Sequence, residues 1–88
     1  MKKCVITVVG KDTVGIIARV CTYLADTKVN ILDISQTIVS GYFNMMMIVD
    51  VSLSRFDALN GDLTKLGEEL GLQIRIQRSE IFDAMHRL

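Results

Sequence analysis

A glycine-containing stretch between an apolar run and a helical pattern is the part of this sequence best suited to hold a small ligand. It reads Gly-Lys-Asp-Thr-Val-Gly-Ile-Ile-Ala over residues 10–18. Asp12 or Thr13 is predicted to cap the helix that follows, and Gly15 leaves the amides of its first turn uncovered. Because those amides lie at the positive end of the helix dipole, they could bind a small carboxylate or phosphate. The same residues also suit a plain strand-to-helix turn.

Composition favours one small domain and excludes several classes of partner. Half of the 88 residues are hydrophobic, and ten basic side chains balance ten acidic ones. A chain with no net charge lacks the basic surface of a nucleic-acid-binding protein or of a polybasic membrane anchor. No apolar run reaches the roughly 20 residues of a membrane span. We therefore expect a cytoplasmic protein with neither nucleic acid nor membrane as partner.

No group of residues has the spacing of a catalytic or metal centre. Cys4 and Cys21 lie in apolar stretches without CxxC spacing, which predicts two buried free thiols in a reducing compartment. The one histidine, His86, is near the C-terminus. A Ser-His-Asp set, a pair of carboxylates in one cleft and a phosphate-binding loop are all missing from the sequence. The sequence predicts neither an enzyme nor a cofactor.

The apolar periodicity predicts six main elements that position the glycine stretch. We expect strands at residues 3–9, 30–39, 42–51 and 72–78, and helices from 14 to about 27 and from Ser54 to a C-cap at Gly71. Ser40-Gly41 suits a two-residue hairpin turn. The first helix is expected to bury the apolar stripe Ile17, Val20, Cys21, Leu24 and Ala25. In the third strand, Met45 and Met47 should point inward and Met46 outward.

This order of elements predicts an α+β fold of the ferredoxin-like βαββαβ type. Right-handed crossovers place both helices on one face of a four-stranded antiparallel sheet, with strand order two, three, one, four. Strand two is then an edge with no Pro, no Lys and one Asp, so a homodimer through the sheet edge or the helices is expected. We assign residues 1–79 to the domain and 80–88 to a short helical extension.

The pattern Gly-Lys-Asp-x-x-Gly-Ile-Ile-Ala, followed by Val29-Asn30-Ile31, resembles the signature of the ACT domain. The resemblance spans about residues 3–78. It is strongest to small stand-alone ACT-domain proteins and to the ACT domains of the glycine-cleavage-system repressor. ACT domains are βαββαβ modules that bind amino acids and regulate metabolic enzymes and transcriptional controllers. Val14 stands where many relatives carry proline, so φ of the first helical turn is not preset.

The resemblance implies an amino-acid site between the first loop of one subunit and the start of strand two of its neighbour. Asp12 would contact the ammonium group, and the amides near Val14, Gly15 and Ile16 would hold the carboxylate. Asn30 and Ile31 would contribute from the second subunit, and side chains such as Ile16, Ile31 and Met46 would set selectivity. The function implied is that of an allosteric metabolic sensor. The alternative is a homodimerising interaction module that regulates a protein partner without a small ligand.

Overall fold

The computed structural model describes residues 2–11, 15–53 and 56–78. Its elements in chain order are β1 (Lys3–Lys11), α1 (Ile16–Asp26), β2 (Asn30–Val39), β3 (Tyr42–Asp50), α2 (Phe56–Leu70) and β4 (Leu72–Arg78). This is the predicted ferredoxin-like βαββαβ fold. Two predicted features, the start of the second helix at Ser54 and the helical extension at 80–88, lie outside the described residues.

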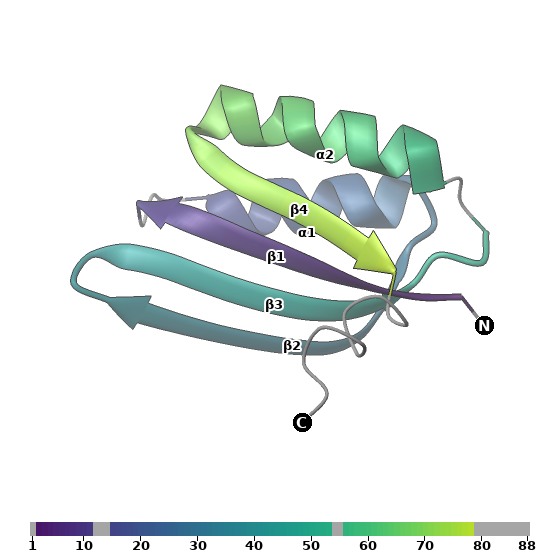
Figure 1. The fold of residues 1–88 in the computed structure, drawn as a ribbon, viewed down its shortest axis with the longest axis horizontal. Coiled ribbons are helices and arrows are strands. Elements are labelled where there is room, and N and C mark those ends of the chain that lie inside the picture. The colour runs from purple at the N-terminus through teal and green to yellow at the C-terminus, as the bar shows by residue number, and fades with distance from the viewer. Residues whose placement is uncertain (1, 12–14, 54–55, 79–88) are drawn as a thin grey trace.

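The sheet has the predicted topology. Its strand order is β2-β3-β1-β4, and each neighbouring pair is antiparallel. Both helices cover the same face of the sheet (Figure 1). Ser40 and Gly41 join β2 to β3 with φ values of 52° and 79°, the left-handed pair that matches the twist of a tight hairpin. Gly71, with φ of 70°, ends α2 as predicted.

The core lies between the helices and one face of the three strands β1, β3 and β4. Its central layer is set by register: Ile6 of β1 lies opposite Met47 of β3 and Ile76 of β4, and all three are buried. Met45 is buried as well, while Met46 is exposed on the opposite face. The predicted alternation of the three methionines is therefore confirmed. Leu59 and Leu63 of α2 complete the core from above.

Helix α1 is rotated about its axis relative to the prediction. Its buried residues are Ile16, Val20 and Leu24, whereas Ile17 and Ala25 of the predicted stripe are exposed. The rotation has a physical cause on the flank that faces α2. There Tyr23 packs against the core, and Arg19 pairs with Glu69 at 3.4 Å. As a result, part of the apolar stripe of α1, including Ile17, stays exposed in the single chain.

The edge strand β2 is poorly covered. Apart from half-buried Ile31, every residue of β2 is exposed, including Ile34 and Ile38. The register with β3 shifts between Ile31 and Asp33. This bulge was not predicted. One extra residue changes the alternation of apolar and polar side chains too little to be recognised in the sequence of a short strand.

Candidate functional site

Gly15, and not one of the two predicted residues, is the N-cap of α1. The N-cap residue is Gly15, in the left-handed conformation with φ of 88°, and no side chain bonds to the cap. The prediction that Asp12 or Thr13 would be the N-cap is therefore wrong. Helix α1 begins at Ile16 rather than at 14, because a left-handed residue cannot be part of a right-handed helix.

The first turn of α1 offers backbone amides. The amide of Arg19 donates to the carbonyl of Gly15 at 3.0 Å, and this is the first bond of the helical ladder. The amides of Ile16, Ile17 and Ala18 precede it, so the ladder does not use them. The first turn contains no acidic residue. The side chain of Ile16 is buried in the core, which leaves only its backbone for a ligand. The dipole of α1 favours an anion at this end.

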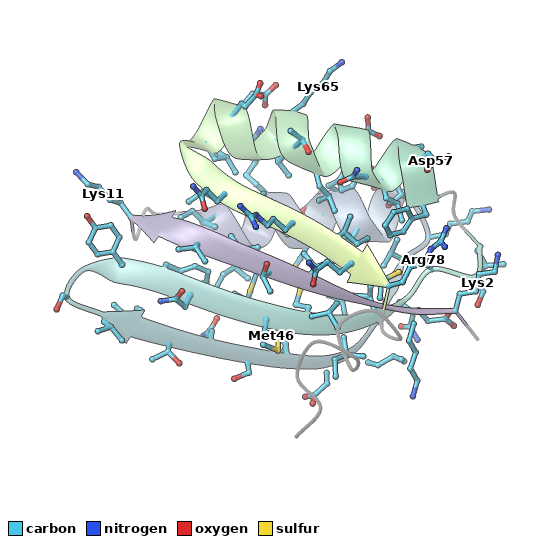
Figure 2. The ribbon with its side chains drawn as sticks, in the orientation of Figure 1. Lys2, Lys11, Met46, Asp57, Lys65 and Arg78 are labelled. Atoms are coloured by element: carbon cyan, nitrogen blue, oxygen red, sulfur yellow. The ribbon has the colours of Figure 1, made fainter. Side chains whose placement is uncertain are left out.

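Asn30 and Ile31 lie far from Gly15 within one chain. Asn30 starts β2 opposite Asp50, and Asp50 is also opposite Lys3 at the start of β1. Gly15 follows the other end of β1, where Lys11 lies opposite Tyr42. Figure 2 shows Lys2 and Lys11 at opposite ends of this strand. A nine-residue strand is about 30 Å long, so one subunit cannot bring these two groups together.

Asn30 lies opposite Asp50, whose carboxylate accepts several hydrogen bonds. Both the backbone N–H and the hydroxyl of Ser52 donate to the carboxylate of Asp50. These bonds hold the pKa of Asp50 below its ordinary value, with the hydroxyl making the largest contribution. Ser52 in turn accepts a bond from the N–H of Lys2 at 3.0 Å. Asp50 is thus kept charged beside Asn30.

Two predicted contacts, Asp12 and Val14, lie outside the described residues, as does Thr13. Among the residues expected to set selectivity, Ile16 and Met46 are not brought together. Ile16 packs in the core under α1, whereas Met46 lies on the helix-free face between Thr7 and Ser35. Figure 2 shows the position of Met46 on the sheet. Its side chain therefore cannot line a pocket shared with Ile16.

A second concave surface lies at the other edge of the sheet and was missed by the sequence analysis. This groove of about 430 Å³ runs between α2 and β4. Its polar lining includes Thr64 and Glu68 from the helix and Arg75 from the strand. The sequence signal for this groove was the alternation of Gln73, Arg75 and Gln77 along β4. The same alternation is typical of any solvated edge strand, so it did not indicate a groove.

Within the described part of the chain, no cluster of His, Cys, Asp or Glu has the arrangement of a metal site. The prediction of two buried thiols is confirmed for Cys4, whereas Cys21 on α1 is only half-buried. Neither α1 nor α2 is long and apolar enough to cross a bilayer.

Comparison with known proteins identifies the family. The sequence pattern of the ACT domain matches residues 2–77. A UPF0237 protein of Bifidobacterium longum is 62% identical over the full length of both chains. A solved ACT domain protein from Streptococcus pneumoniae is 42% identical, with a TM-score of 0.83 over 97% of this chain and 98% of that one.

One further similar structure is that of a regulatory protein. A putative glycine cleavage system transcriptional repressor matches 89% of this chain and 46% of its own, with 27% identity and a TM-score of 0.81. Both resemblances found in the sequence, to small ACT proteins and to that repressor, are confirmed. The family assignment also agrees with the prediction of a regulatory domain rather than an enzyme. The match to the ACT domain covers residues 2–77, which include nearly all of the described fold, and the chain therefore belongs to the ACT domain family.

Proposed function

We propose that this protein is a cytoplasmic, dimeric sensor that binds an amino acid and passes its bound state to a regulated partner. The observation that carries this proposal is the start of α1. Left-handed Gly15 opens a helix whose first amides are left unused by the helical ladder and whose first turn has no acid. Such a turn suits the carboxylate of an amino acid. Membership of the ACT family supports the same assignment.

In the proposed complex, the ligand lies between two subunits. The amides near Val14, Gly15 and Ile16 hold its carboxylate, and Asp12 of the same subunit contacts its ammonium group. Asn30 and Ile31 come from the partner. The distance between Gly15 and Asn30 within one chain supports this division, because the two ends of β1 separate them. A ligand that bridges two subunits stabilises the dimer by mass action.

Thermal unfolding at fixed protein concentration, with each amino acid in turn at millimolar concentration, tests the proposal. We expect one or two amino acids to raise Tm by a few degrees, and isothermal titration to show heat with the same ones. Asp12→Ala should abolish the shift. Asp26→Ala is the matched control, since Asp26 is an exposed acid at the far end of α1, and it should keep the shift.

A set of twenty amino acids that leaves Tm unchanged and gives no heat would contradict ligand binding. The alternative function, a dimeric interaction module without a small ligand, would then be favoured. It is supported by the exposed apolar residues on β2 and α1. Retention of one partner from cell extract by the immobilised protein, equally with and without amino acids, would distinguish it.

A further inference from the structure

Val5 is buried on the side of the sheet that carries no helix. Both helices cover the other side (Figure 1). Side chains alternate along a strand, and Cys4 and Ile6 belong to the core cluster, so Val5 between them lies on the helix-free face. It is nevertheless only 4% exposed, and it is not a member of the core cluster. The core on the other side of the sheet therefore does not account for its burial.

Burial on the helix-free face decreases along β1. Val9 lies on this face four residues after Val5 and is 41% exposed, with half-buried Thr7 between the two. Both valines have β3 on one side and β4 on the other, so the neighbouring strands do not explain the difference. Ile48 and Gln77, which lie opposite Val5 on those strands, are half-buried as well. One end of the helix-free face is thus covered, and the cover is centred on Val5.

The covered end of the face is the one at which β4 ends. Arg78, the last residue of β4, lies opposite Cys4, and Gln77 lies opposite Val5. The segment of residues 79–88 therefore begins next to the covered site. As a helix, these residues would be about 15 Å long, whereas neighbouring strands are about 4.8 Å apart. This length is enough to cross from β4 over β1 and β3 to β2.

Other segments of the chain are badly placed to cover Val5. Residues 12–14 follow the far end of β1, and residues 54–55 precede α2 on the other side of the sheet. Lys3, the next residue of β1 on this face toward the loop after β3, is exposed, so that loop does not extend over Val5. The burial is a property of the single chain, to which no second copy contributes. The C-terminal segment is the remaining one that is both near and long enough.

The sequence of the C-terminal segment matches this surface. Its predicted helix has Asp83 on its polar side, and its acids, Glu80 and Asp83, are both in the first half of the segment. The helix-free face around Val5 has exposed Lys3 and Arg75, and opposite charges favour one orientation of a docked element. The apolar residues share the other side of the helix; they are Ile81, Phe82, Met85 and Leu88.

We propose that residues 79–88 fold back as an amphipathic helix on the helix-free face of their own sheet. Ile81 and Phe82, the first apolar residues after β4, cover Val5 and Ile48. The domain then has three layers, with the sheet between the pair α1 and α2 and the C-terminal helix. A regulated partner cannot reach this part of the face unless the segment is displaced. This inference does not depend on amino-acid binding.

Thiol labelling of the full chain in a Cys21→Ser background tests the cover. Val5→Cys places a thiol under the proposed helix, and Val9→Cys is the matched control on the same strand and face. With a bulky disulfide reagent, Val5→Cys should react at least about 100-fold more slowly than Val9→Cys, since a buried thiol reacts only when its surroundings open. Equal rates would overturn the proposal. So would protection that appears only at high protein concentration, because a second copy would then be the cover.

Phe82→Asp tests whether the C-terminal segment is the cover. It should bring the labelling rate of Val5→Cys to within several-fold of that of Val9→Cys, whose own rate should stay unchanged. Arg87→Gln changes the net charge equally on the polar side of the predicted helix, and it should keep the protection. Cys4 on the core side reports global unfolding if it becomes labelled, and Phe82→Ala then gives the same comparison with a milder change. Protection of Val5→Cys that survives both Phe82→Asp and removal of residues 79–88 would overturn the proposal.

Thermal unfolding provides a test that needs no cysteine. Phe82→Ala should lower Tm by about 5 °C, because it removes buried apolar area from a small domain, whereas Arg87→Gln should leave Tm unchanged. In a Val5→Ala background the decrease should be smaller, since the two side chains contact each other, and in a Val9→Ala background it should be complete. Equal decreases in the two backgrounds, or no decrease, would overturn the contact. These measurements are made without amino acids, so their outcome is separate from that of the proposed sensor function.

Discussion

The hydroxyl of Tyr23 in α1 donates a hydrogen bond to Asp62 Oδ2 in α2 at 2.9 Å. This bond and the Arg19–Glu69 pair join the two helices on their exposed side. Burial, followed by the bond to Asp62, raises the pKa of Tyr23 to about 12. The contact accompanies the rotation of α1, in which Tyr23 lies toward α2 and Ile17 stays exposed.

Tyr23→Phe removes this bond and keeps the ring in the core. Because the bond is largely solvent-exposed, we expect a loss of about 0.5–1 kcal/mol of unfolding free energy. Urea unfolding followed by circular dichroism measures it. Asp62→Ala should cost a similar amount, and the double variant should cost less than the sum of the two. Fully additive costs would show that the two side chains do not interact.

Burial of Tyr23, together with its bond to Asp62, makes stability sensitive to alkaline pH. The pKa of Tyr23 is raised in the folded state from 10.0 to about 12, so the neutral hydroxyl is the form that stabilises the fold. Its contribution is complete below pH 10 and is lost as the pH rises through 12. The difference in unfolding free energy between the protein and Tyr23→Phe should therefore shrink over this range. A difference that is constant from pH 9 to pH 12 would contradict the linkage.

Asp50 gives the opposite dependence at acid pH. Its pKa is lowered from 3.8, mainly by the hydroxyl of Ser52, so its contribution to stability is present above pH 3.8 and is lost as the pH falls through the folded-state pKa. Ser52→Ala should move that pKa back toward its ordinary value, as followed by carboxyl chemical shifts. The stability difference from the unaltered protein should narrow below pH 3.8. An unchanged titration of Asp50 in the variant would show that the hydroxyl is not its main partner.

Sequence periodicity predicted the elements well because each has a strong local signal. The alternation Met45–Met47, the Ser40-Gly41 turn and the glycine after α2 all reflect rules that act within a few residues. The bounds of β2 and β4 were predicted to the residue. Strand order followed from the chirality of the crossovers.

Tertiary contacts decided the features that were not predicted. The rotation of α1 depends on Asp62 and Glu69, which are far from Tyr23 and Arg19 in the sequence. The start of α1 depends on Gly15 adopting positive φ, although Asp12 and Thr13 are the better capping residues by type. For the expected site, the sequence resemblance named Gly15, which precedes α1, and Asn30, which starts β2. Only the register shows that they occupy opposite ends of one sheet.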